Sequence, residues 1–133
     1  MTDQKTEYMV ALNDFRQARR KAALEEMLAR LGGKPTELLS YEEVKQYLGA
    51  AVTSPQVVRD IPLDSIVGSV GRYKDFTRSY LPKRERTEHR WAAVQTAVVE
   101  QKGVDPIEVS QIGEAYFVID GNHRVSVARQ AGS

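Results

Sequence analysis

The sequence predicts an α+β protein, in which a small mixed sheet with helices is preceded by an N-terminal helical arm. Three observations support this fold class. Apolar residues recur at helical spacing over residues 6–31. Two runs rich in β-branched and aromatic residues, 106–112 and 116–119, flank Gly113 and predict a hairpin. A helix-like segment begins just after Gly121 and ends at about Gly132.

The first helix carries two apolar sets on different sides. The first set is Tyr8, Ala11, Leu12, Phe15, Ala18 and Ala22. The second set is Leu24, Met27, Leu28 and Leu31. At about 100° per residue the second set is rotated by well over 90° from the first, so we expect the two halves of the helix to face different neighbours. The pair Gly32 and Gly33 ends this helix.

A capping box opens a second, short helix. Ser40 is the expected N-cap and Glu43 the residue three positions on, and Gly49 closes the helix. We therefore divide the chain into an N-terminal helical arm of about residues 1–50 and an α/β body of about residues 58–133.

The body is expected to begin with a strand, Ile61–Ile66, after a polar link at residues 53–55. Next comes an aromatic-rich stretch whose spacing is compatible with a short helix packed on the core. Its aromatic residues are Tyr73, Phe76 and Tyr80.

A longer helix is predicted to start at Pro82 or Thr87 and to end at Gly103. Three apolar residues at helical spacing define its expected buried face: Trp91, Val94 and Val98. We interpret Trp91 as a core anchor, and a base-stacking platform is the alternative. In the helix after Gly121, we expect Arg124, Ala128 and Ala131 to share one side.

Composition excludes several function classes. With 133 residues the chain can form one domain with a core. It has no cysteine, which excludes disulfides, thiolate zinc sites and cysteine nucleophiles. It lacks an apolar run of the roughly 20 residues that span a bilayer and lacks a signal-peptide pattern at its start, so we expect a cytoplasmic protein without a membrane partner.

Positive charge gathers in one part of the body, although the net charge is only +1. Residues 72–90 hold seven Lys and Arg against three Asp and Glu, whereas residues 91–120 hold one against five. A basic patch follows from this distribution: Lys83, Arg84, Arg86 and Arg90. Such a patch could contact phosphates, and the alternative is a solvated loop with internal Arg–Glu pairs.

The most informative segment is the turn at residues 120–124. A strand that turns through Gly121 into a helix leaves backbone N–H groups at the helix N-terminus, and these favour an anion. His123 and Arg124 beside that turn point to phosphate or carboxylate recognition. The simpler alternative is that Asp120 caps the helix and that both side chains are solvated.

This turn, Asp-Gly-Asn-His-Arg, follows a strand and the segment Pro106–Val109, and the arrangement resembles the ParB/sulfiredoxin superfamily, including its ParB-like N-terminal and nuclease domains. The resemblance covers about Ile61 to Gly132. Partition proteins carry Gly-Glu-Arg-Arg at residues 121–124. Sulfiredoxins carry Gly-Cys-His-Arg, which places their catalytic cysteine at Asn122, and related serine kinases carry Gly-x-His-Arg.

The resemblance implies a nucleoside phosphate as ligand, CTP or ATP/ADP, bound as in a regulatory switch. Its implied binding residues are Arg72, Gly121, Asn122, His123 and Arg124.

One alternative is a phosphoryl-transfer or hydrolase enzyme, with Asp120 and His123 as candidate catalytic groups. Another is a DNA-binding, partition-like or nuclease-like module that uses the basic patch. Histidine spacing predicts no resident metal, but Asp120 could take Mg²⁺ that arrives with a nucleotide. An oligomer could form through the first helix.

Overall fold

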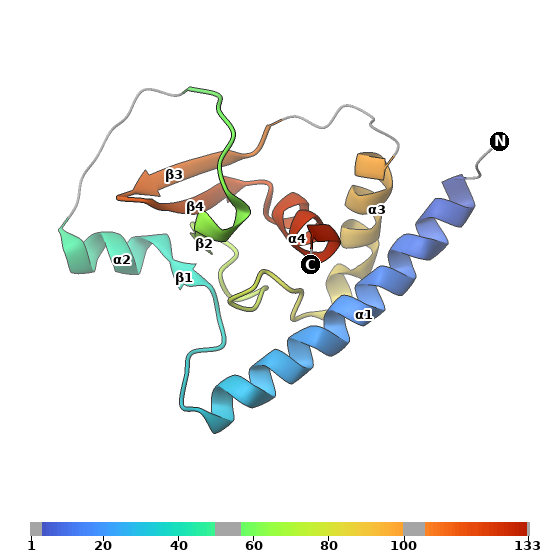
Figure 1. Ribbon diagram of the computed structural model, residues 1–133, viewed down its shortest axis with the longest axis horizontal. Helices are drawn as coiled ribbons and strands as arrows, with labels where there is room; N and C mark the ends of the chain where they lie inside the picture. Colours follow the sequence, from blue (N-terminus) through green and yellow to red (C-terminus); the bar gives the residue numbers. More distant parts are fainter. Residues whose placement is uncertain (1–3, 50–56, 100–105, 133) are drawn as a thin grey trace.

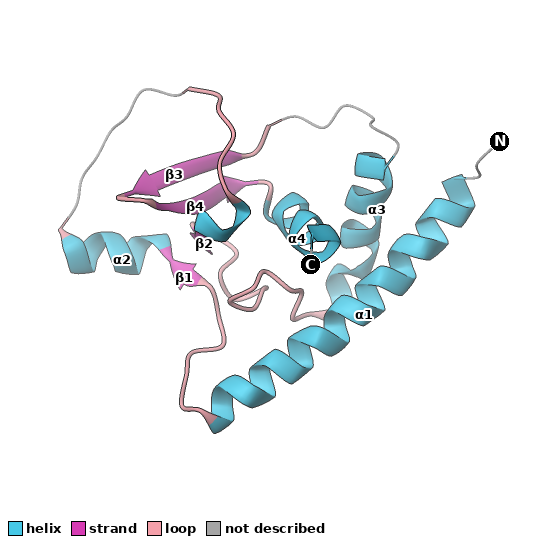
Figure 2. Cartoon of the chain, viewed as in Figure 1, coloured by secondary structure: helices cyan, strands magenta, loops and turns pink. Residues whose placement is uncertain are grey.

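The computed structural model describes residues 4–49, 57–99 and 106–132, which form an α+β fold around a mixed sheet of four strands (Figures 1 and 2). The strands are β1 (Leu39–Ser40), β2 (Ile66–Ser69), β3 (Glu108–Ile112) and β4 (Ala115–Asp120). Their spatial order is β1-β2-β4-β3. Strand β2 is parallel to both neighbours, whereas β4 and β3 form an antiparallel hairpin. The predicted fold class is therefore confirmed.

The helices are α1 (Gln4–Leu31), α2 (Tyr41–Leu48), α3 (Glu88–Val99) and α4 (Asn122–Gly132). Helix α4 packs between the sheet and α3, and α1 packs along the other side of α3 (Figure 1). Within the described residues, each helix is too short or too polar to cross a membrane. This stacking brings α3 beside the turn that joins β4 to α4.

Local signals set the element ends as the sequence predicts. Gly33 ends α1 with φ +65°, and the Ser40 Oγ accepts a 3.5 Å hydrogen bond from the Glu43 N–H at the start of α2. Gly49, with φ +65°, closes α2. Gly113 turns the β3–β4 hairpin with φ +61°, so the predicted hairpin is confirmed, with its first strand beginning at Glu108.

The first strand of the body lies later than predicted. Of the predicted strand Ile61–Ile66 only Ile66 is in a strand: Leu63–Ser65 form a 3-10 turn that the Ser65 N–H closes on the Pro62 carbonyl at 3.0 Å. The strand is β2, which contains Gly68. A Cβ at Gly68 would lie 2.3 Å from the Leu39 carbonyl oxygen, so β1 can pack this closely only against glycine. Because glycine is depleted in strands, the sequence did not predict a strand here.

The aromatic stretch after β2 forms an irregular loop and no helix. Its backbone pairs through isolated bridges, Phe76 with Pro82 and Thr77 with Glu37, and Tyr80 has φ +64°. The predicted core packing holds, because Phe76 and Tyr80 are fully buried. They belong to a sheet-side cluster with Leu38, Ile66, Val118 and Val125.

A second cluster joins the three long helices. It consists of Phe15, Ala18, Trp91 and Val127. Trp91 is fully buried, and its Nε1 donates to the Ser126 Oγ at 2.9 Å, which confirms it as a core anchor. Val94 is only partly buried and Val98 is 39% exposed, so the prediction of burial was wrong for Val98 because the cluster ends at Val94.

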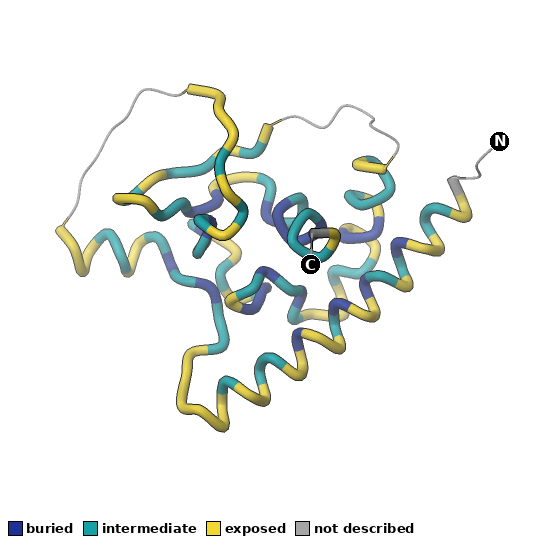
Figure 3. Tube along the Cα trace, viewed as in Figure 1, coloured by how far each residue is buried: buried dark blue, intermediate teal, exposed yellow. Residues whose placement is uncertain are grey.

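Other helical faces also differ from their predictions. On α4 the buried residues are Asn122, Val125, Ser126 and Val127, and the side expected to hold Arg124, Ala128 and Ala131 is not fully buried. On α1 the first apolar set supplies the buried residues, whereas the second set, from Leu24 to Leu31, is 51–80% exposed and belongs to neither core cluster (Figure 3). The expected links at residues 53–55 and Gly103 lie outside the described residues.

Candidate functional site

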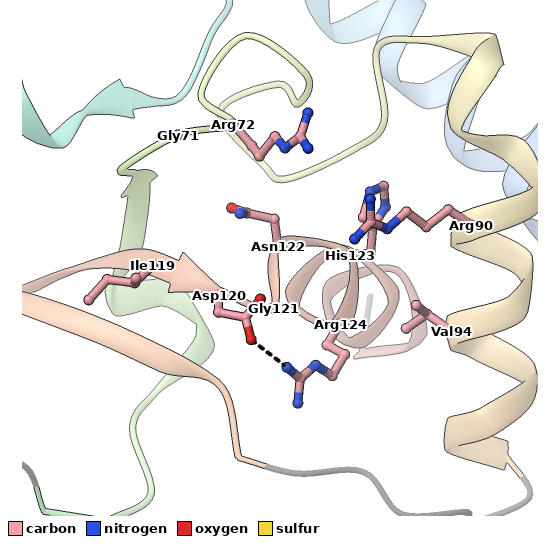
Figure 4. Close-up of a pocket in the computed structure, with 10 residues that line it drawn as sticks. All are labelled: Gly71, Arg72, Arg90, Val94, Ile119, Asp120, Gly121, Asn122, His123 and Arg124. Carbon is pink, nitrogen blue, oxygen red and sulfur yellow. Dashed lines mark ion pairs between the residues drawn. The ribbon is translucent and has the colours of Figure 1, made fainter.

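A pocket of about 330 Å³ opens where β4 ends and α4 begins (Figure 4). It is lined by Gly71, Arg72, Arg90, Val94, Ile119, Asp120, Gly121, Asn122, His123 and Arg124. The structure thus brings together every residue that the sequence predicted for nucleotide binding. It adds Arg90 from the basic patch, together with Val94, Ile119 and Gly71, for which the sequence carries no chemical signal.

Gly121 makes the turn possible. Its φ is +110°, and a Cβ there would lie 2.5 Å from the Ile107 Cγ2. The Val125 N–H donates to the Gly121 carbonyl at 3.0 Å, which is the first hydrogen bond of α4. The N–H groups of residues 122–124 therefore precede the hydrogen-bonded ladder, at the positive end of the helix dipole.

Three guanidinium groups from separate elements surround this helix end (Figure 4). Arg72 lies in the loop after β2, where its N–H donates to the Ser69 Oγ at 3.0 Å. Arg90 lies in the first turn of α3, and Arg124 in the first turn of α4. Two of the three have a carboxylate nearby: Arg72 lies 3.5 Å from Asp75, and Arg124 lies 3.6 Å from Asp120.

His123 is a neutral side chain in this pocket. Its burial, and then the positive charges of Arg90 and Arg72, lower its pKa to about 4, although Asp75 opposes the shift. The ring packs edge-on against Phe76, with centroids 5.4 Å apart. Its Nδ1 is buried and lacks a hydrogen-bond partner among the described residues.

The two candidate catalytic groups differ in exposure. The Asp120 side chain is 73% exposed at the pocket rim, whereas His123 is largely enclosed. Asn122 is 8% exposed, and its Oδ1 accepts a 2.8 Å hydrogen bond from the Tyr80 hydroxyl. Sequence reasoning missed this partner, since no local pattern links residues 42 positions apart.

The four residues of the predicted basic patch have different surroundings. Arg90 lines the pocket, and Arg84 and Arg86 are exposed before α3. The Lys83 side chain is only 12% exposed, and its Nζ lies 3.4 Å from Glu26 and 3.3 Å from Glu37. Lys83 therefore differs from the expectation: two carboxylates distant in sequence neutralise it.

Among the described residues, no group of three or more His, Asp or Glu side chains is placed to hold a metal ion. No protein-family model, no curated protein and no solved structure matches this chain. The chemistry of the pocket is therefore inferred from its own residues and from the motif that they form.

Proposed function

We propose that this chain binds a nucleoside phosphate in the pocket at the N-terminus of α4. The observation that carries the proposal is the meeting of Arg72, Arg90 and Arg124 around one helix end, although they come from three separate elements. Charge-assisted hydrogen bonds from guanidinium groups to phosphate are among the strongest in proteins. The backbone N–H groups and dipole of the helix add to the same preference.

The charge of the pocket favours a ligand with several negative charges. Three guanidinium groups face two nearby carboxylates, so a single bound anion must compete with Asp75 and Asp120. A diphosphate or triphosphate can contact more than one guanidinium at once. The pocket volume of about 330 Å³ lies at the lower end of the range for pockets that enclose a whole small ligand. It therefore suits the diphosphate or triphosphate part of a nucleotide.

The nucleoside part of the proposal rests on the motif at residues 120–124, which resembles that of the ParB/sulfiredoxin superfamily. That resemblance favours CTP or ATP/ADP, with a role as a regulatory switch. The Asp120 carboxylate at the pocket rim could contact Mg²⁺ that accompanies the nucleotide, because Mg²⁺ usually binds one or two carboxylates together with substrate phosphates.

A phosphoryl-transfer or hydrolase activity is the second candidate, and one observation favours it. His123 is neutral at pH 7, so its imidazole can accept a proton from a nucleophile. A pKa of about 4 makes it a weak base, which is why binding without turnover ranks first. Measuring inorganic phosphate released from CTP and ATP over hours separates the two, since only the enzyme gives repeated turnover.

The test of binding is titration calorimetry with pyrophosphate, CTP, ATP and ADP, with and without Mg²⁺. Arg90→Ala should weaken binding about ten- to a hundredfold, which corresponds to one lost charge-assisted hydrogen bond. Arg84→Ala is the matched control, because Arg84 is exposed and lies outside the pocket. It should leave the affinity within about twofold of the unchanged chain, as an exposed, screened charge does.

Two outcomes would contradict the proposal. Millimolar pyrophosphate and nucleotides could give no heat with the folded protein. Alternatively, duplex DNA could bind tightly, with equal losses for Arg84→Ala and Arg90→Ala and a steep dependence on salt. The second outcome would favour the DNA-binding alternative, in which exposed cations act together regardless of the pocket.

A further inference from the structure

The Tyr80 hydroxyl lies under the floor of the pocket. Tyr80 is fully buried, and its Oη lies 2.8 Å from the Asn122 Oδ1 and 3.1 Å from the Gly68 carbonyl oxygen. Burial raises the pKa of this hydroxyl, so it keeps its proton and acts as a donor. The shorter of the two contacts goes to Asn122, the first residue of α4.

Tyr80 is held there in a strained conformation. Among the described residues it is the non-glycine residue with positive φ, +64°. Such strain persists where the surroundings fix it, and it gathers at functional sites. Here the Tyr80 N–H donates to the Thr77 carbonyl at 2.9 Å, and the Thr77 hydroxyl donates to the Glu25 carboxylate of α1 at 2.7 Å. The Ser79 N–H reaches the same carboxylate at 3.3 Å.

This arrangement fixes which end of the Asn122 amide is available to a ligand. With Oδ1 occupied, the remaining polar atom is Nδ2, which only donates. Among the described residues, no acceptor bonds to the Asn122 Nδ2. This atom is also absent from the buried polar atoms without a partner, so it is not sealed from solvent. Since Asn122 lines the pocket, Nδ2 reaches the pocket's solvent.

We infer that Tyr80 is a positioning residue for phosphate: its hydroxyl orients the Asn122 amide so that Nδ2 donates to a phosphate oxygen. This inference rests on the proposed function, and it names a donor beyond the guanidinium groups and the helix N–H groups. Phe76, in the same loop and cluster, packs without any hydroxyl, so core packing alone does not require one at residue 80.

The test is a double-mutant cycle read by titration calorimetry with inorganic pyrophosphate. Tyr80→Phe and Asn122→Ala should each weaken binding by about two- to tenfold, the effect of one hydrogen bond. The double variant should bind no more weakly than Asn122→Ala, because Tyr80 acts through that amide. Tyr73→Phe, in the same loop but outside the pocket, is the matched control and should bind like the unchanged chain.

A structural role for Tyr80 alone would not move the second readout, the ¹⁵N–¹H signals of the Asn122 side-chain amide. Pyrophosphate should shift them in the unchanged protein and shift them less in Tyr80→Phe. Asn122→Asp keeps the acceptor for Tyr80 but replaces Nδ2 with an oxygen, so it should bind more weakly than Asn122→Ala. This variant also tests the inference if Tyr80→Phe does not fold.

The outcomes separate the inference from the proposed function. If the unchanged protein binds no pyrophosphate, both fail. If it binds but Tyr80→Phe binds equally well, the inference alone is overturned. It is also overturned if the effects of Tyr80→Phe and Asn122→Ala simply multiply, or if Asn122→Asp binds as well as the unchanged chain.

Discussion

Truncation of Trp91 should remove much of the stability of this protein. The indole is fully buried between α1 and α4. Its ring centroid lies 5.7 Å from that of Phe15, and its Nε1 lies 2.9 Å from the Ser126 Oγ. A buried Trp removes about 150–250 Å² from water, which at about 25 cal/mol per Å² is an upper limit of about 4–6 kcal/mol. Since Ala keeps part of that burial, we expect Trp91→Ala to cost about 3–5 kcal/mol.

The assay is urea unfolding followed by far-ultraviolet circular dichroism, because Trp91 is the only tryptophan and fluorescence would be lost with it. Val99→Ala is the control on the same helix, since Val99 is 57% exposed, and it should cost less than about 1 kcal/mol. A loss below about 1 kcal/mol for Trp91→Ala would refute the reasoning. It would mean that the cluster of α1, α3 and α4 is not a core.

Three further predictions concern the sheet, the pocket and α1. Gly68→Ala should strongly lower the stability measured by urea unfolding, because the new Cβ would lie 2.3 Å from the Leu39 carbonyl oxygen and 2.6 Å from the Phe117 ring. Gly71→Ala is the control: its Cβ would have no atom within 4 Å, so its stability should be unchanged. In the folded protein the pKa of His123 is about 4, below the 6.5 of an unperturbed histidine. Between pH 4 and 6.5 the unfolded protein therefore binds a proton at His123 that the folded protein does not. Stability should therefore fall as the pH drops from about 6.5 towards 4, and His123 contributes a slope of at most about 1.4 kcal/mol per pH unit. The urea midpoints measured at pH 7 and pH 5 should differ less in His123→Gln than in the unchanged protein. Lys83→Ala should lower stability by about 1–3 kcal/mol, because Glu26 and Glu37 lose their partner, while calorimetry should show unchanged pyrophosphate affinity.

The features that the sequence predicts correctly are those with local causes. The Ser40 cap acts three residues away, Gly113 turns a hairpin of adjacent strands, and Gly121 opens the helix that follows it. Each depends on backbone chemistry within one turn. The motif at residues 120–124 is local in the same sense, so residues that line the pocket could be named before their geometry was known.

The features that the sequence does not predict depend on tertiary packing. Arg90 belongs to the pocket only because α3 packs against α4, and Lys83 is neutralised by carboxylates 46 or more positions away. The strand β2 was not predicted because it contains Gly68, a residue that is disfavoured in strands. The close approach of the Leu39 backbone requires a glycine at this position. Tyr80 gives no local signal of its positive φ, since that strain is fixed by Glu25 from α1.

The partners of α1 lie far along the chain, and this has a consequence for synthesis on the ribosome. Tyr8 contacts His89 and Asp14 contacts Gln95, both 81 positions apart, and Lys21 contacts Gln130, 109 positions apart. At about 5–20 residues per second, α4 is synthesised roughly 5–20 s after α1. Until α3 is made, the Phe15 and Ala18 face lacks Trp91, and until α4 is made the cluster lacks Val127. The nascent chain therefore exposes an apolar helix face until α3 and α4 have been synthesised, and such transiently exposed surface favours aggregation.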